Sequence, residues 1–398
     1  MTAARTRLAR AAAVSALALV CGGCASLSSW IPEIPAPSFG WLTSMFGGGK
    51  KIAPVPDFPT TASVQIVWQV ALGKSAPGLA PAVTPEAIYA ATSSGTILRI
   101  DPVSGAVVWR VEAGRKIAAG VGADATLVVV GTDKGDVFAY GTDGKEQWKS
   151  RVSSEVLGPP RVADGMVVVF TGDGRIHGLT AADGKTKWVY QRTNPPLTIR
   201  NYAGGTTSRG ALFAGTAGGK LIAVDLVTGN IGWEGNVATP KGATELERIA
   251  DVTSLPVVED RQVCAVAYQG RIACFEIVRG EPVWTRDVSS LTGLALDNRF
   301  LFVADDTGAV HALDKVTGAS AWKQDKLAAR HVGGVQIAGD FLLVEDPEGY
   351  VYLLDRNDGK LVGRAPTDGT PPTAQPAQSG ANAVWQSEAG TLYAVTGR

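Results

Sequence analysis

Short runs of alternating apolar and polar residues, separated by Asp-Gly, Thr-Gly and Ser-Gly turns, fill the chain from residue 61 onward. Such alternation predicts antiparallel strands joined by tight hairpins. In one representative stretch, strands are expected at residues 117–123, 126–131, 136–140 and 146–152. A helical period of 3.6 residues does not persist anywhere in the sequence, so the pattern predicts an all-β protein.

This strand pattern repeats along the chain. In residues 216–233, TAGGKLIAVDLVTGNIGW, a short apolar run is followed by Asp225, a Thr-Gly turn and Trp233. A unit of about 40 residues with four strands is typical of a propeller blade. The repeats therefore predict an eight-bladed β-propeller with four antiparallel strands per blade. The glycine that opens each expected third strand marks the eight copies: Gly95, Gly135, Gly174, Gly219, Gly270, Gly308, Gly349 and Gly390.

The two ends of the repeat region are complementary. The last copy stops at Arg398, before a fourth strand, whereas residues 63–72 form an additional strand ahead of the first copy. Trp68 in that strand precedes Trp109 by one repeat length. We expect the N-terminal strand to supply the outer strand of the last blade, which closes the ring and removes an exposed edge.

Residues 1–23 have the pattern of a secretory signal. Basic residues precede an apolar stretch of about ten residues, which is too short to cross a bilayer. The sequence Gly22-Gly23-Cys24 resembles the cleavage site of bacterial lipoproteins and makes Cys24 the expected lipidated residue. Lipidation of Cys21 and cleavage of an ordinary signal peptide are the alternatives.

Residues 24–60 are rich in Pro, Ser and Gly and follow no strand or helix period. This composition predicts a flexible tether between the lipidated cysteine and the propeller, which is expected to span residues 61–398. The aromatic side chains in the tether either contact a membrane or a partner or are solvated.

Composition and motifs together limit the classes of function that the chain can have. The 37 basic residues balance the 37 acidic ones, so bulk charge argues against nucleic-acid binding. His177 and His311 occupy a repeat slot that mostly holds apolar or aromatic residues, and we expect both in the core. The sequence shows no metal-ligand motif and no Ser with evident His and Asp partners, so no catalytic residue, metal or cofactor is predicted. The repeated Trp is interpreted as packing between blades rather than as a cofactor site.

Cys264 and Cys274 flank one hairpin turn symmetrically about Gln269. Residues placed opposite each other on adjacent strands can form a disulfide in an oxidising compartment. Two buried free thiols are the alternative.

Two repeats are longer than the others. The extra residues follow Trp188 and Trp233, where the outer strand of one blade connects to the inner strand of the next. All such connections emerge on one face of a propeller, and loops that exceed what closure requires often carry function. These insertions, 192–205 and 234–254, are expected to form a protein-contact patch, although they could instead bind only each other through salt bridges. The candidate contact residues are Leu197, Ile199, Arg200, Tyr202, Glu245, Arg248 and Asp251.

The signal, the tether, the quinoprotein-type repeats and the segment ATELERIADVTSLPVV together resemble the BamB family of outer-membrane assembly lipoproteins. The resemblance covers the whole chain. It implies a non-catalytic scaffold, lipid-anchored at the periplasmic face of the outer membrane, that aids folding and insertion of outer-membrane proteins. The expected partner is the barrel-forming subunit BamA, bound at its periplasmic domains through the two insertions, with nascent outer-membrane proteins as a further candidate.

The family motif matches this chain at four positions, Leu197, Ile199, Arg200 and Asp251, whereas Thr253 stands where the family often has a second Asp. Two other classes of protein are alternatives. Quinone-dependent dehydrogenases share the repeat type but are longer and carry an adjacent Cys pair and calcium ligands, which are not evident here. The other alternative is a periplasmic propeller that binds peptides or peptidoglycan.

Overall fold

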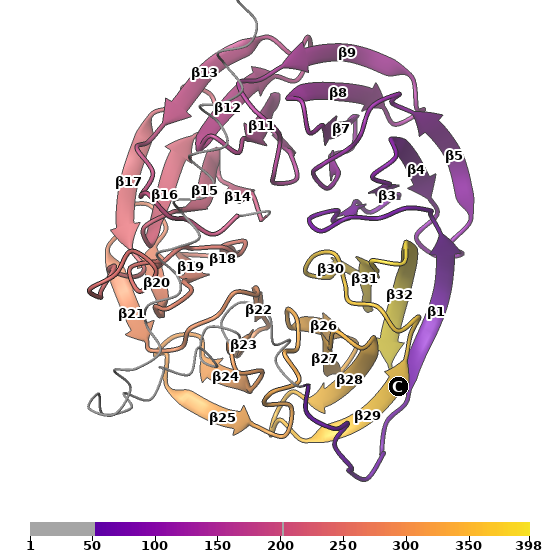
Figure 1. Cartoon of the computed structure of the whole chain (residues 1–398), viewed down its shortest axis with the longest axis vertical. Helices are drawn as coiled ribbons and strands as arrows, with labels where there is room; N and C mark the ends of the chain where they lie inside the picture. The colour runs from indigo at the N-terminus through magenta and orange to yellow at the C-terminus, as the bar shows by residue number, and fades with distance from the viewer. Residues whose placement is uncertain (1–51, 201–202) are drawn as a thin grey trace, which may run out of the picture. The chain divides into compact units, whose positions relative to one another are not determined.

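The computed structural model describes residues 52–200 and 203–398, so the signal sequence, Cys24, most of the tether and Tyr202 lie outside the described residues. The described chain forms eight sheets of four antiparallel strands, which are arranged in a ring (Figure 1). The predicted eight-bladed propeller is therefore confirmed. None of the described residues belongs to a helix long and apolar enough to cross a membrane.

The first four blades follow one another along the chain, each from its inner to its outer strand. Blade 1 contains β2 (Ala82–Val83), β3 (Ile88–Ala91), β4 (Thr96–Ile100) and β5 (Val107–Glu112). Blade 2 contains β6 (Gly122–Ala123), β7 (Leu127–Gly131), β8 (Asp136–Gly141) and β9 (Glu146–Arg151). Blade 3 contains β10 (Arg161–Ala163), β11 (Met166–Phe170), β12 (Arg175–Thr180) and β13 (Thr186–Gln191). Blade 4 contains β14 (Gly205–Ser208), β15 (Ala211–Thr216), β16 (Lys220–Asp225) and β17 (Ile231–Asn236).

The remaining blades have the same order, except that the N-terminal strand completes the last one. Blade 5 contains β18 (Val257–Glu259), β19 (Gln262–Val266), β20 (Ile272–Glu276) and β21 (Pro282–Arg286). Blade 6 contains β22 (Leu294–Leu296), β23 (Phe300–Ala304), β24 (Val310–Asp314) and β25 (Ser320–Gln324). Blade 7 contains β26 (Gln336–Ala338), β27 (Phe341–Glu345), β28 (Tyr350–Asp355) and β29 (Leu361–Pro366). Blade 8 contains β30 (Ala377–Ser379), β31 (Asn382–Gln386), β32 (Thr391–Gly397) and β1 (Val64–Ala71).

The ring closes as the sequence predicts. Strand β1 pairs antiparallel with β32, from Val64 opposite Gly397 to Ala71 opposite Thr391, and the two strands lie side by side in Figure 1. Beyond them, the Ser63 N–H donates to the Arg398 carbonyl at 2.7 Å and the Arg398 N–H donates back at 3.0 Å. The described ends of the propeller are thus joined by a backbone ladder rather than by a covalent bond.

Strand direction divides the connections between two faces. Because successive strands of a blade are antiparallel, the connections between blades and the turns between second and third strands lie at the same ends of the strands. We call this the insertion face, since both long insertions belong to connections between blades. The turns between first and second strands, and between third and fourth strands, lie on the opposite face.

A tryptophan on the outer strand joins each of seven blades to the next. Between blades 3 and 4, the Trp188 indole N–H donates to the Leu226 carbonyl at 2.9 Å, and its ring lies over Gly229. A Cβ at Gly229 would lie 2.5 Å from the Trp188 ring, so glycine is required there. The same bond recurs at 2.7–3.1 Å at all seven junctions. The packing interpretation of the repeated Trp is therefore confirmed for these residues: Trp68, Trp109, Trp148, Trp188, Trp233, Trp284 and Trp322.

The eighth junction, between blades 7 and 8, has Gly363 in the tryptophan position. A Cβ at Gly363 would lie 2.8 Å from the Ala62 carbonyl oxygen, because the N-terminal chain enters here. The backbone N–H groups of Thr61 and Ala62 donate to the Val362 carbonyl at 2.8 and 2.9 Å. Blade 8 has no turn between its third and fourth strands for a tryptophan to cover, since that place is taken by the two ends of the propeller.

The segment just before β1 differs from the sequence expectation. Residues 52–60 were expected to be part of the flexible tether, but the structure holds them against the ring. Val55 and Phe58 pack against the core cluster between blades 6 and 7, and the Arg364 guanidinium donates to the Pro56 carbonyl at 2.9 Å. We call residues 53–62 the N-terminal strap.

Cys264 and Cys274 lie directly opposite each other on β19 and β20 and form a disulfide. His177 is buried, and its Nε2 lies 3.0 Å from the Ser153 hydroxyl. His311 Nε2 lies 2.8 Å from an Asp305 carboxylate oxygen. Both histidines are therefore partnered within the fold. The described residues include no group of three or more His, Cys, Asp or Glu side chains arranged to hold a metal ion.

Candidate functional site

The two insertions lie next to each other on the insertion face and are joined by Asp251. One Asp251 carboxylate oxygen accepts the Ile199 backbone N–H at 2.7 Å, and the other accepts the Gly218 N–H at 2.8 Å. Its own carbonyl accepts the Tyr268 N–H at 2.9 Å. Because Asp251 is only 3% exposed, its carboxylate cannot serve as a contact surface while these bonds persist. It fixes the first insertion against blade 4 and against the second insertion.

The second insertion contains a short capped turn. The Glu247 N–H bonds to the Thr244 hydroxyl at 3.2 Å, and the Glu247 carboxylate accepts the N–H groups of Ala243 and Thr244 at 2.8 and 3.1 Å. This reciprocal pattern resembles the capping box of a helix start. The backbone hydrogen bonds from Thr244 and Ala243 lower the pKa of Glu247. The turn therefore has a defined shape even though its side chains are exposed.

Two further contacts hold this turn in place. Arg248 pairs with Glu245 at 3.2 Å and donates to the Gly242 carbonyl at 3.1 Å. Gln269, at the tip of the β19–β20 hairpin, can donate its amide to the carbonyls of Glu247 and Ile249 at 3.0 and 2.9 Å when its nitrogen faces them. Glu245 and Arg248 thus contact each other within the turn.

Arg200 is paired within the protein. Its guanidinium lies 2.6 Å from the Glu155 carboxylate, which belongs to the connection between blades 2 and 3. Both side chains line a cavity of about 270 Å³ next to the first insertion, together with Ile199 and Asp251. This ion pair ties the first insertion to the neighbouring connection and not to the second insertion, so it is not the salt bridge between the insertions that the sequence left open.

Exposed leucines extend over three successive connections of the insertion face. Leu197 in the first insertion is 48% exposed, Leu246 in the second is 57% exposed, and Leu291 in the next connection is 46% exposed. The Thr253 hydroxyl donates to the Leu291 carbonyl at 3.3 Å, which links the second insertion to that connection. We call these three residues the leucine row. Apolar side chains held on a fixed backbone are suited to burial against a protein partner.

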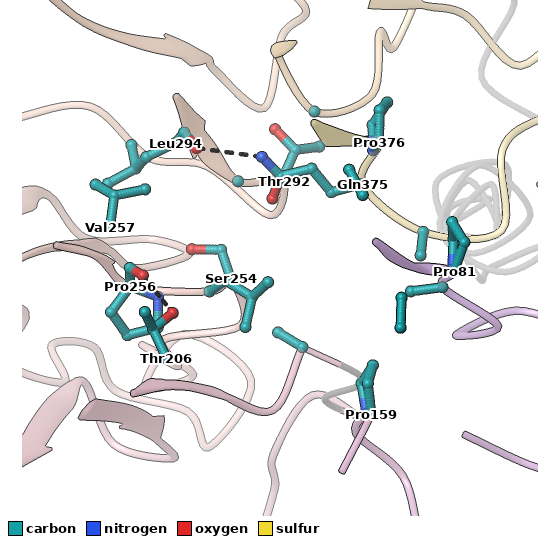
Figure 2. Close-up of a pocket in the computed structure, with 18 of the residues that line it drawn as sticks. Pro81, Pro159, Thr206, Ser254, Pro256, Val257, Thr292, Leu294, Gln375 and Pro376 are labelled. Atoms are coloured by element: carbon teal, nitrogen blue, oxygen red, sulfur yellow. Dashed lines mark hydrogen bonds between the residues drawn. The ribbon is translucent and has the colours of Figure 1, made fainter. Parts of the chain in front are cut away.

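The centre of the ring contains a cavity of about 980 Å³ lined by the entry segments and inner strands of all the blades. Pro81, Pro159, Pro256 and Pro376 line it from four different blades (Figure 2). Side chains cross between blades at its wall: Gln375 donates to the Leu294 carbonyl at 3.2 Å, and Thr206 donates to the Pro256 carbonyl at 2.6 Å (Figure 2).

Arg161 also lines this cavity and donates to the Gly205 carbonyl of the next blade. Burial lowers the pKa of Arg161 to about 10. Its observed bond joins blade 3 to blade 4, so the arginine has a structural role at the cavity wall.

The structure thus separates the expected contact residues into groups. Leu197 is exposed, and Ile199 is half-buried beside it. Arg200, Glu245 and Arg248 are in internal ion pairs, Asp251 is buried, and Tyr202 lies outside the described residues. The sequence pattern does not single out Leu246, Leu291 or Glu155, and it marks Gln269 only as the centre of a hairpin. Leu246 could have been predicted as a contact residue, because it is the one large apolar residue in its charged turn. Leu291 could not, because it lies in a connection of ordinary length and no sequence pattern distinguishes it.

Comparison with known proteins agrees with this architecture. The family model described as "Outer membrane protein assembly factor BamB" matches residues 93–324. The chain is 43% identical over 363 residues to the protein of that name from Nitrosomonas eutropha, which covers 89% of this chain and 87% of the relative. It is 39% identical over 347 residues to the protein of that name from Bordetella pertussis, covering 87% and 90% of the two chains.

Solved structures give the same result for the fold. The crystal structure of BamB from Moraxella catarrhalis superimposes with a TM-score of 0.78 at 25% identity, covering 84% of this chain and 99% of that one. A quinohemoprotein alcohol dehydrogenase from Comamonas testosteroni superimposes with a TM-score of 0.66 at 14% identity, covering 83% and 76%. The second likeness shows a shared propeller fold alone.

Proposed function

Because this chain belongs to the family of outer membrane protein assembly factors BamB, we propose that it is a non-catalytic scaffold whose insertion face binds the periplasmic domains of the barrel-forming subunit, BamA. Nascent outer-membrane proteins are a second proposed partner. The proposal rests on the family membership and on one structural observation, the leucine row. Its leucines stand on connections held by Asp251, Gln269 and the capped turn, so little order has to be gained on binding.

Substitution of Leu197 tests this proposal. Leu197→Asp places a charge where an apolar side chain would be buried, and burial of a leucine contributes roughly 1.5–3 kcal/mol. We expect at least about a tenfold loss of affinity for the barrel-forming subunit, with an unchanged melting temperature, since Leu197 is exposed. The measurement is co-purification from detergent-solubilised membranes together with a thermal melt of the variant.

The matched control is Val316→Asp, at an exposed valine in a turn on the opposite face. It should bind like the wild type. Wild-type binding by both Leu197→Asp and Leu246→Asp would place the contact elsewhere on the ring. Arg200→Glu is a poorer probe, because it would set a second carboxylate against Glu155 and disturb the insertion itself.

We further propose that Cys24 carries the lipid anchor, which would place the protein at the periplasmic face of the outer membrane. The support is the Gly22-Gly23-Cys24 sequence after the apolar stretch of the signal. Cys24→Ser should release the protein into the soluble periplasmic fraction, while Cys21→Ser should leave it in the membrane. An unmodified N-terminal residue in the mass spectrum of the wild-type protein would contradict the anchor.

A further inference from the structure

The central cavity is large, mostly apolar and free of acidic groups. Its volume of about 980 Å³ is at the upper end of the range for sites that hold small ligands. Prolines from four blades form part of its wall (Figure 2), and proline has no backbone N–H to offer a ligand. Among the described residues that line the cavity, none is acidic, and the ionisable side chains are those of Arg161 and Arg200. The wall therefore carries positive charge without a matching negative charge.

Arg161 is the arginine on this wall that has no counter-ion. Arg200 is paired with Glu155 at 2.6 Å. Arg161 is half-buried at the start of β10, and its Nε–H donates to the Gly205 carbonyl. In the described part of the chain no carboxylate pairs with Arg161, and its two terminal nitrogens make no hydrogen bond. A guanidinium that is partly removed from water without a counter-ion gains by binding an anion.

The pKa of Arg161 is consistent with an unpaired cation. Burial lowers this pKa to about 10, and no neighbouring acid counteracts the effect. The guanidinium nevertheless remains charged at neutral pH, so the cavity keeps its positive charge under ordinary conditions.

A second polar group on the wall also lacks a partner. Ser254, which is labelled in Figure 2, is 4% exposed, and its hydroxyl has no hydrogen-bond partner among the residues that the structure describes. An unpaired buried hydroxyl is unfavourable, so such a group is usually satisfied by a bound molecule. Gln375 and Thr206, by contrast, donate to carbonyl groups of other blades. Arg161 and Ser254 are therefore the side chains through which the wall can bind a polar ligand group.

The cavity begins beside the leucine row. Leu291, which belongs to the row, also lines the cavity, as does Ile199 of the first insertion. Both residues stand in connections between blades, so they mark the end of the cavity at the insertion face. Apolar side chains thus continue from this face into the ring, where Arg161 and the prolines follow.

From these observations we propose that the central cavity binds an amphiphilic monocarboxylate, whose carboxylate is held by the Arg161 guanidinium and whose apolar body lies against the proline wall. One arginine without a counter-ion fits one carboxylate rather than a polyanion. The apolar C-terminal end of a peptide and a fatty acid both have this chemistry. The site involves no contact with the barrel-forming subunit, so the inference goes beyond the proposed function.

Isothermal titration calorimetry with two matched pairs of probes tests the site. N-acetyl-trileucine with a free carboxylate is compared with its C-terminal amide, and octanoate is compared with octanamide. The full-length protein is held in phospholipid nanodiscs, because a detergent could itself fill an apolar cavity, and empty nanodiscs correct for partition of the probes into lipid.

We expect saturable binding of at least one carboxylate at one site per chain. Its amide should bind at least about tenfold more weakly, since hydrogen bonds between charged groups are stronger than those to neutral groups. Binding of the peptide acid alone would assign the site to a chain end, and binding of octanoate alone would assign it to a fatty acid.

Two substitutions of Arg161 separate ligand binding from folding. Arg161→Met and Arg161→Lys both lose the Nε bond to Gly205, so any effect of that bond on stability is shared, but only lysine keeps the charge. The affinity for the carboxylate should fall at least about tenfold in Arg161→Met and clearly less in Arg161→Lys. Lys145→Gln, in an exposed turn on the opposite face, is the control and should bind like the wild type.

Three results would each overturn the site: no saturable binding of either carboxylate, equal affinity for acid and amide, or wild-type affinity in Arg161→Met. The comparison of acid and amide uses the wild-type protein, so it remains decisive if Arg161→Met does not fold. Failure of the proposed function would be seen differently, as unchanged co-purification of Leu197→Asp with the barrel-forming subunit, and it would leave carboxylate binding as it is.

Discussion

Glu345, at the end of β27, is a buried carboxyl group whose two oxygens have no hydrogen-bond partner among the residues that the structure describes. Burial, and secondarily the charge of Asp346, raises the pKa of Glu345 well above its ordinary value. The folded protein therefore holds a proton that the unfolded chain releases above a pKa of about 4.3. By linkage, the free energy of unfolding must fall as pH rises from there toward the folded-state pKa.

Glu345→Gln should remove this dependence, because the amide has nearly the shape of the protonated acid and does not ionise. The variant should unfold at higher urea concentration than the wild type at pH 8 and at about the same concentration near pH 4. The wild-type loss can reach about 1.4 kcal/mol per pH unit. Glu388→Gln, at an exposed position, is the control and should follow the wild type. If the free energy of unfolding depended on pH in the same way for Glu345→Gln and the wild type, Glu345 would have a hydrogen-bond partner in solution.

Asp251 shows which part of the candidate site could be predicted from sequence. The position of the two insertions predicts that Asp251 lies near Arg200. It does not predict that Asp251 is a buried acceptor of backbone hydrogen bonds. A sequence cannot distinguish a carboxylate that faces a partner from one that accepts two backbone N–H groups 33 and 52 residues away. Leu197 is exposed, as its predicted role in partner contact requires, and it stands in a loop longer than ring closure requires.

At the scale of elements, seven of the eight junctions between blades are made by an outer-strand tryptophan that covers a glycine turn. Trp188 is buried, bonded to the Leu226 carbonyl and in contact with Gly229. Strands and turns were predictable because the repeat presents the same residue types eight times. The docking of the strap was not, because it depends on Arg330 and Arg364, some 300 residues away, and leaves no periodic pattern in residues 52–60.

Trp188→Ala should lower the free energy of unfolding by about 3–5 kcal/mol, since it deletes a large buried side chain and leaves a cavity between two blades. Trp188→Phe keeps much of the apolar contact but loses the indole N–H, which leaves the Leu226 carbonyl unpaired. It should therefore lower the free energy of unfolding by only ~1 kcal/mol, the contribution of a single hydrogen bond. Urea unfolding of both variants measures the difference. Equal stability of Trp188→Ala and the wild type would mean that the blades are held together without this contact.

At the scale of the whole molecule, the two faces of the ring carry different structural features. The opposite face carries the tryptophan-covered turns that join the blades, and the insertion face carries the leucine row and the start of the strap. The leucine row, which we propose as the binding surface, can therefore change without disturbing the contacts between blades. The ring is most easily opened at blade 8, because this is the one blade assembled from both ends of the described chain.

Deletion of residues 391–398 tests whether blade 8 holds the ring closed. It removes β32, so β1 loses its partner and β31 becomes an exposed edge that can pair with other molecules. It also removes side chains from the core clusters on both sides of blade 8, including Leu392 and Val395. We expect loss of cooperative unfolding and aggregation in sedimentation velocity. Deletion of Arg398 alone removes the bonds to Ser63 beyond the ladder and should leave a folded monomer. A truncated protein that lacks residues 391–398 and melts like the wild type would show that the seam does not hold the ring closed, and that the other junctions suffice.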